Sequence, residues 1–189
     1  MSLVKDRVAY RKALGEHNKK MLMNIKQEEL DALASAILAA NRIFVAGWGR
    51  SGNVTRILSM NCSQLGLKTY VVGDNSTPSI HEGDLLVIGS GSGETETMVE
   101  IAKQCKEHGA KLALISGNAE STIGKLADVN VVIERIGAKT QAEREEVGIA
   151  FVRSYFQVVV MVCDCITSYI MDEKGWKSDR ISYYHNNLE

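Results

Sequence analysis

The chain has almost no net charge and no long apolar run, and each absence excludes a class of protein. Its 22 lysines and arginines are balanced by 23 acidic residues, and the two kinds are interleaved. Proteins that bind nucleic acid or anionic membranes usually carry an excess of basic residues, so neither is an expected partner. No apolar stretch approaches the ~20 residues that cross a bilayer, and residues 1–20 are too polar for a signal peptide. We therefore expect a cytoplasmic protein.

The motifs of several enzyme classes are also missing. There is no H-E-x-x-H, G-x-S-x-G or G-x-x-x-x-G-K-[ST] pattern, which leaves zinc proteases, α/β-hydrolases and P-loop nucleotidases without local support. The four cysteines form no C-x-x-C pair and are expected to be buried, reduced thiols. His17 and His108 lie in charged helical segments, so we expect both to be solvated.

Short apolar runs, each followed by a turn and an amphipathic segment, predict a single α/β domain. With 45% apolar residues, 189 residues can bury one substantial core. We expect strands at 43–47, 69–72, 85–89, 112–116 and 129–133. Helices should follow at 51–65, 95–108 and 121–127. Continuously apolar runs are typical of parallel strands buried on both faces, so the sheet should be doubly wound with helices on both faces.

Helical segments flank this predicted core. Apolar residues recur at three- and four-residue steps up to about residue 40, which predicts two N-terminal helices. Residues 142–174 read as one long helix, nearly free of glycine, with an apolar centre at 158–163. A helix that is apolar all round is buried on more than one face. We expect it to pack against another subunit, with a central helix of the monomer as the alternative.

Two glycine- and serine-rich turns, each following a predicted strand, are the most informative features. Residues 47–52 read Gly-Trp-Gly-Arg-Ser-Gly, and residues 89–95 read Gly-Ser-Gly-Ser-Gly-Glu-Thr. Glycine tolerates positive φ and close approach, so such a turn can aim backbone N–H groups at an anion where a helix begins. In open α/β sheets, ligands bind at the carboxyl ends of the strands, where the strand order reverses. If the first and third strands are neighbours, both turns lie at that point.

Together the two turns could hold one phosphate from two sides. Serine and threonine hydroxyls would bind it, and an arginine would add positive charge. The candidate ligand-binding residues are Gly49, Arg50, Ser51, Ser90, Gly91, Ser92, Gly93, Glu94 and Thr95.

A dinucleotide site is the competing interpretation of the first turn. Gly47-x-Gly49-x-x-Gly52 follows a strand, and Asp74 lies roughly 20 residues further on, as in NAD-dependent oxidoreductases. A dinucleotide site does not require the serine-rich second turn, however, or Ser51 inside the first, whereas a site for one phosphate uses both turns.

These motifs resemble the sugar isomerase (SIS) domain family, specifically its 6-phospho-3-hexuloisomerase branch. The resemblance covers nearly the whole chain and includes Val-Gly-Asp at 72–74 with Thr77-Pro78, Glu-Lys-Gly at 173–175 and the ending at 185–189. It implies one SIS domain over residues 1–189, with a flavodoxin-like five-stranded sheet. It also implies a tetramer without metal or organic cofactor that interconverts hex-3-ulose 6-phosphate and fructose 6-phosphate through an enediol.

The resemblance also implies roles for individual residues. The phosphate would be held by Ser51, Ser90, Ser92 and Thr95. His185 would handle protons on oxygen, reaching a neighbouring subunit's site.

One departure from the family pattern concerns the base. The family's glutamate falls at Phe156, which cannot take a proton, and a family arginine falls at Asn61. The base could be Glu145 or Glu146, roughly ten residues away, and Glu146 is our candidate. Alternatively, the protein uses another base on a different phosphosugar, or only binds a sugar phosphate. Glutamates 143, 145 and 146 also fit a solvated first helical turn favoured by the helix dipole.

Overall fold

A five-stranded parallel sheet forms the centre of the molecule. The structure is a computed structural model that describes residues 3–136 and 140–188. The strands are β1 (Ile43–Gly47), β2 (Thr69–Val71), β3 (Leu85–Gly89), β4 (Lys111–Ser116) and β5 (Val129–Val132), in the order β2-β1-β3-β4-β5. The predicted doubly wound sheet is therefore confirmed. β1 and β3 are neighbours, with Gly47 opposite Gly89, so the two turns leave the sheet side by side.

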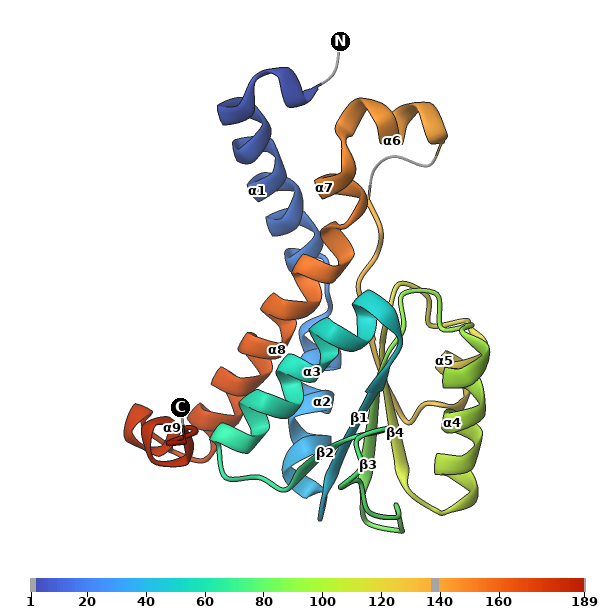
Figure 1. Cartoon of the computed structure of the whole chain (residues 1–189), viewed down its shortest axis with the longest axis vertical. Coiled ribbons are helices and arrows are strands. Elements are labelled where there is room, and N and C mark those ends of the chain that lie inside the picture. The colour runs from blue at the N-terminus through green and yellow to red at the C-terminus, as the bar shows by residue number, and fades with distance from the viewer. Residues whose placement is uncertain (1–2, 137–139, 189) are drawn as a thin grey trace.

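Helices cover both faces of the sheet and create two hydrophobic cores. One face carries α2 (Gln27–Ala39), α3 (Gly49–Gln64) and α8 (Ser154–Glu173), and the other carries α4 (Glu96–Glu107) and α5 (Thr122–Leu126) (Figure 1). Successive strand residues point to opposite faces. Val45 and Val87 thus belong to the first core, whereas Phe44 and Ile88 belong to the second. This two-sided burial explains why the strands are continuously apolar.

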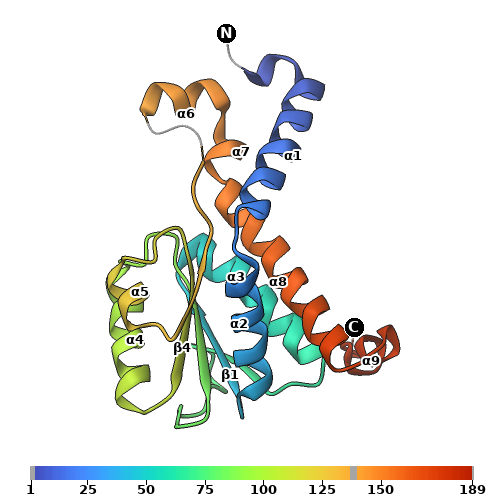
Figure 2. The same cartoon turned by 180° about the vertical axis from the view of Figure 1, so that it is seen from behind.

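The first helix and the segment before α8 extend beyond the sheet. They are α1 (Arg7–Met23), preceded by the 3-10 turn η1 (Leu3–Lys5), and α6 (Gln141–Val147) with α7 (Ile149–Val152). Figure 2, seen from behind, shows α1 and α6 together on the side where β1 ends in α3. The two predicted N-terminal helices are confirmed as α1 and α2.

The prediction of a single helix over residues 142–174 is wrong, because the segment forms three helices, α6, α7 and α8. Gly148 ends α6 with φ +77°, a left-handed conformation that glycine adopts without strain. A side chain at this position would also collide with Val4 and Tyr10 of the N-terminal segment. The single glycine of the segment therefore decides where the helix breaks.

The last of these helices, α8, packs against α1, α2 and α3 of its own chain. Its buried residues include Val158, Val162 and Ile166. By length and composition α8 could cross a membrane, which the sequence reading did not anticipate, although a core helix passes the same test. Met161 on its outer side is 37% exposed. Packing of this surface against another subunit stays a prediction.

The C-terminal tail docks on the body of the protein. A short helix, α9 (Ser178–Tyr184), lies beside the end of α3. Arg180 donates from Nε to the carbonyl oxygen of Leu65 at 2.7 Å, and its guanidinium stacks on Trp176 at 3.8 Å. The Tyr184 ring lies against Gly66, where a side chain would collide with it.

Candidate functional site

The first turn brings two glycines into direct backbone contact. A Cβ atom on Gly52 would collide with the carbonyl group of Gly47, and Gly49 has φ +55°. The helix α3 starts at Gly49, two residues before the predicted start, so Arg50 and Ser51 belong to its first turn. No side chain caps this helix, and its first N–H groups are available to an anion.

The second turn presents two serine hydroxyls whose hydrogens are uncommitted within the described chain. Ser90 is buried, and its Oγ accepts the N–H of Gly93 at 3.1 Å. Ser92 is exposed, and its Oγ accepts the N–H of Glu94 at 3.2 Å. Each hydroxyl therefore accepts one backbone bond and keeps its own O–H to donate. A phosphate accepts such bonds, so the geometry suits an anion.

At the end of the second turn, the predicted ligand-binding residues Glu94 and Thr95 differ in whether their side chains are already bonded. Thr95 occupies the N-cap position of α4, but its side chain forms no capping hydrogen bond. Glu94 instead accepts the backbone N–H of Thr122 with Oε1 at 2.8 Å. That bond lowers the pKa of the Glu94 carboxyl. The Thr95 hydroxyl is thus open to a ligand, whereas the Glu94 carboxylate is held by the start of α5.

Position 156 lies beside the first turn. The guanidinium of Arg50 sits 5.6 Å from the centre of the Phe156 ring, within the range of a cation–π contact. The arginine thus meets an aromatic face at the position where the family pattern has a carboxylate. Asn61, the other departure, is buried and donates to Asp164 and Thr167 at 3.0 Å each, which joins α3 to α8.

Sequence reasoning missed Arg135, which lies against the second turn. A Cβ atom on Gly91 would collide with the Arg135 guanidinium, which also sits 5.3 Å from the centre of the Tyr155 ring. Tyr155 is anchored by its hydroxyl, which donates to the carbonyl of Ile115 at 2.9 Å, and burial raises the pKa of this phenol. The available signal was an arginine shortly after the fifth strand, at the edge where the turns lie.

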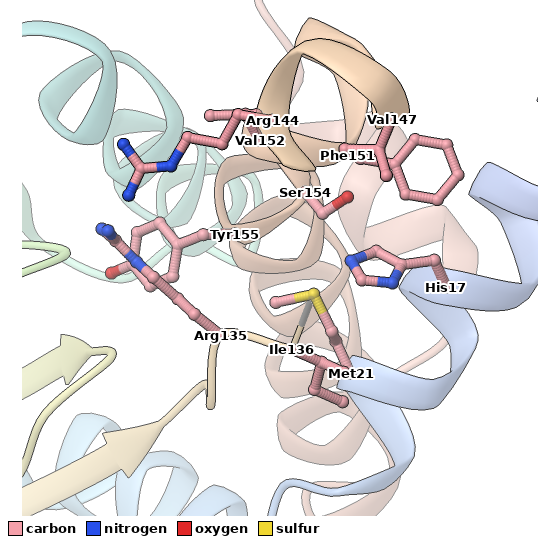
Figure 3. Close-up of a pocket in the computed structure, with 10 residues that line it drawn as sticks. All are labelled: His17, Met21, Arg135, Ile136, Arg144, Val147, Phe151, Val152, Ser154 and Tyr155. Carbon is pink, nitrogen blue, oxygen red and sulfur yellow. The ribbon is translucent and has the colours of Figure 1, made fainter. Parts of the chain in front are cut away.

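A cavity of about 320 Å³ opens beside Arg135. We call it the arginine cavity. Figure 3 shows its lining, which includes His17, Arg135, Arg144, Phe151, Ser154 and Tyr155.

The expectation of a solvated His17 is wrong. The centre of its ring lies 5.1 Å from that of Phe151 in a tilted contact, and its Nε2 is buried without a hydrogen-bond partner in the part of the chain that the structure describes. Burial, together with the nearby charge of Lys20, lowers the pKa of His17.

A second hollow, of about 700 Å³, lies where the first turn meets the start of α4. Glycines 47, 49 and 52 line one side, and Thr97 and Met98 line the other. Trp48 lines it as well and is 72% exposed, so the core does not hold this side chain.

The structure does not bring the two predicted catalytic residues to the turns of the same chain. Glu146 is exposed on α6, away from the sheet (Figure 1). His185 follows α9 at the far end of α3, whose 16 residues span about 24 Å. Glu143 and Thr140 form a capping box at the start of α6. This agrees with the alternative that these glutamates belong to the first turn of a helix.

The cysteines have the properties of buried thiols. Cys62, Cys105 and Cys163 are buried, and Cys165 is half-buried. Burial raises the pKa of Cys62 and of Cys163 to about 12, so neither thiol ionises near neutrality. In residues 3–136 and 140–188, no three His, Cys, Asp or Glu side chains are grouped to hold a metal ion.

Comparison with known proteins identifies similar sequences and structures. The SIS domain profile matches residues 36–162. The chain is 37% identical to a 3-hexulose-6-phosphate isomerase of Bacillus subtilis, covering 87% of this chain and 89% of that protein. It is 34% identical to the enzyme of the same name from Mycobacterium gastri, covering 100% and 89%.

A solved structure extends the comparison to the fold. A hypothetical protein of Methanococcus jannaschii, for which a 3-hexulose-6-phosphate isomerase function has been inferred, superposes with a TM-score of 0.79. It is 27% identical, and the match covers 97% of this chain and 99% of that chain.

Proposed function

Because the chain belongs to the SIS domain family, we propose that it is a phosphosugar isomerase that interconverts hex-3-ulose 6-phosphate and fructose 6-phosphate. The observation that carries the proposal is the pair of turns at the point where the strand order reverses. Two helix N-termini and the hydroxyls of Ser90, Ser92 and Thr95 belong to these turns, which supports a phosphate site at this edge of the sheet.

Holding the phosphate fixes the reacting carbons. The isomerisation removes a proton from carbon 2 of the 3-ketose. The electron pair of that C–H bond forms the double bond between carbons 2 and 3, and the carbonyl pair moves onto the oxygen of carbon 3, which takes up a proton. The resulting enediol then loses the proton of its carbon 2 hydroxyl, and carbon 3 takes up a proton, which leaves a ketone at carbon 2. Only protons move, so the chemistry requires no organic cofactor or metal, and the protein contributes position and acid–base groups.

The base belongs to the same proposal. Glu146 is the candidate base, because Phe156 cannot accept a proton, and the His185 of a neighbouring subunit would handle the protons on oxygen. His185 lies about 24 Å along α3 from the turns of its own chain, so only another copy could bring it to them. We therefore include in the proposal a cytoplasmic homo-oligomer, a tetramer, with exposed Met60 and Met161 on the faces of α3 and α8 available for packing.

A second candidate function is sugar-phosphate binding without turnover. The observation that favours it is the contact between Arg50 and Phe156, which puts an aromatic ring where the family pattern has its base. The phosphate turns would serve such a sensor equally well.

Turnover and binding of fructose 6-phosphate separate the two functions. Ser92→Ala removes one donor to a charged phosphate, so we expect affinity to fall about 10- to 100-fold. Ser35→Ala, an exposed serine on α2, is the matched control and should leave affinity unchanged. Wild-type turnover that Ser92→Ala lowers supports the isomerase. Binding without turnover supports the sensor, and absence of both overturns the assignment to this substrate.

A further inference from the structure

Two guanidinium groups share one side of the arginine cavity without a carboxylate between them. Arg135 follows β5 and Arg144 lies on α6, and Figure 3 shows both side chains ending beside the Tyr155 ring. Among the described residues, neither forms an ion pair with Asp or Glu. Both side chains are exposed, so their positive charges are available to an anion.

This pair adjoins the second phosphate turn. Arg135 lies against Gly91, which stands between the two serines whose hydroxyls can donate to a phosphate. Arg135 therefore joins the second turn to the cavity that it lines, and a sugar phosphate bound by Ser90 and Ser92 would have this guanidinium beside it. Because Gly91 has no side chain, it leaves room for the Arg135 guanidinium, which a side chain at position 91 would displace.

The interior of the cavity is prepared for a polar ligand. Among the described residues, the buried Nε2 of His17 has no hydrogen-bond partner; it points into the cavity from α1, where Ser154 faces it from α8 (Figure 3). An unpaired buried polar atom requires an explanation, and a bound hydroxyl or water supplies one. About 320 Å³ lies at the lower end of the range for small-molecule sites.

We propose that the arginine cavity is the sugar subsite of the isomerase, and that Arg135 and Arg144 bind the enediolate oxygens on carbons 2 and 3. This inference rests on the proposed function. When carbon 2 loses its proton, negative charge develops on the oxygen of carbon 3, and the two guanidinium groups are in place to stabilise it. Donors already positioned where charge develops lower the barrier, because they need no reorganisation during the reaction.

Binding of two phosphorylated probes tests the inference. One is a phosphorylated sugar hydroxamate, whose planar oxygen pair mimics the enediolate, and the other is glucitol 6-phosphate, which carries no charge beyond its phosphate. Arg135→Gln and Arg144→Gln should each weaken hydroxamate binding about 100-fold and glucitol 6-phosphate binding less than about threefold, with kcat falling about 10²- to 10³-fold. Arg135→Lys, which keeps the charge without the fork, should recover part of the loss. Arg11→Gln, an exposed arginine on α1, is the control for the same chemical change.

The outcomes separate this inference from the proposed function. Equal loss of both probes in the glutamine variants would mean that the arginines bind the phosphate, and unchanged binding would mean that the cavity is no subsite. Either result overturns the inference, while wild-type turnover of fructose 6-phosphate would leave the isomerase intact. Wild-type protein that neither binds nor converts a sugar phosphate would overturn both. Thermal unfolding of each variant shows whether the fold is retained.

Discussion

At the amino edge of the sheet, acidic and basic side chains pair with each other, whereas at the carboxyl edge Arg135 forms no ion pair within the described chain and the pair between Arg56 and Asp74 is exposed. At the amino edge, Arg42 donates to both oxygens of Asp84 at 3.0 and 2.6 Å, and Lys106 contacts both oxygens of Asp128 at 2.7 Å. At the carboxyl edge, Arg135 lies against Gly91 and an aromatic ring instead.

The difference separates stability from function. A charge that meets its partner within the fold contributes to folding and leaves nothing for a ligand. An unpaired charge or an uncapped helix contributes little to folding, but it is ready for an anion. The comparison predicts that changes to paired groups alter stability alone, whereas changes to the unpaired groups of the carboxyl edge alter binding.

The largest expected effect is at Gly52, where the carboxyl edge is tightly packed. Gly52→Ala would push a Cβ atom into the Gly47 backbone, which cannot turn aside as a side chain could. We expect a loss of about 3 kcal/mol of unfolding free energy, at the upper end for overpacking, together with loss of phosphate binding. Chemical denaturation measures the first and calorimetric titration the second.

A second glycine provides the matched control. Gly15 lies in α1 with nothing within 4 Å of its added Cβ, so Gly15→Ala should stabilise the protein by about 0.5–1 kcal/mol. If Gly52→Ala were as stable as wild type, the close approach of the two glycines would not be required.

The amino edge is tested by Asp84→Asn. This change removes a buried carboxylate that accepts from Arg42 and from the backbone N–H of His81, so we expect a loss of about 2 kcal/mol. Isomerase activity at 25 °C should be unchanged. A fall in kcat without loss of stability would contradict the division between the two edges.

The same residue predicts a pH dependence. Burial alone would raise the pKa of Asp84, but hydrogen bonds and charge from Arg42, with the His81 N–H, hold it below its ordinary value. An unfolded aspartate titrates near ~3.9, so the stabilisation is fully present above that pH and is lost as pH falls through the folded pKa. Wild-type stability should therefore fall more steeply in acid than that of Asp84→Asn. If the stabilities of the two proteins fell in parallel with pH, a carboxylate other than Asp84 would dominate the acid dependence of stability.

Two helix caps sharpen the comparison within the carboxyl edge. Ser121 accepts the N–H of Gly124 at 3.1 Å and caps α5, whereas the Thr95 side chain leaves α4 uncapped. Ser121→Ala should cost about 1 kcal/mol of stability and leave phosphate affinity unchanged. Thr95→Val should change stability by less than about 0.5 kcal/mol but weaken phosphate binding roughly tenfold. Chemical denaturation and phosphate titration measure both variants. Equal changes in stability and in phosphate affinity for the two variants would contradict the prediction.

The fold could be predicted from the sequence where local pattern and tertiary burial agree. The runs at 43–47 and 85–89 are apolar because both faces of the sheet are covered, and the structure has strands there with the same bounds. The segment before α8 could not be predicted so well. One glycine, Gly148, outweighs the helical propensity of its neighbours by adopting positive φ against the N-terminal segment.

The candidate site, like the fold, could be predicted from the sequence only in part. Its turns are local, so glycine spacing and hydroxyls were enough to place them side by side once β1 and β3 were neighbours. Arg135 and His17 could not be found, because each acquires its environment from elements distant in sequence: Gly91 and Tyr155 in one case, Phe151 in the other. Long side chains can reach several surroundings, and only packing selects among them.

The smallest expected effect concerns the contact that marks the departure from the family pattern. Phe156→Glu would replace the ring beside Arg50 with a carboxylate within reach of the guanidinium. Arg50 is exposed, so the new ion pair should change stability by no more than about 0.5 kcal/mol. It would also withdraw positive charge from the first turn, so we expect phosphate affinity to fall about threefold, with Phe156→Gln, the uncharged isostere of the glutamate variant, as the control that removes the ring alone. Titration with inorganic phosphate at low and high salt measures the difference between the two variants. Equal affinities at low salt would show that Arg50 does not contribute to the phosphate site, and the carboxyl edge would then depend on hydroxyls, helix ends and Arg135.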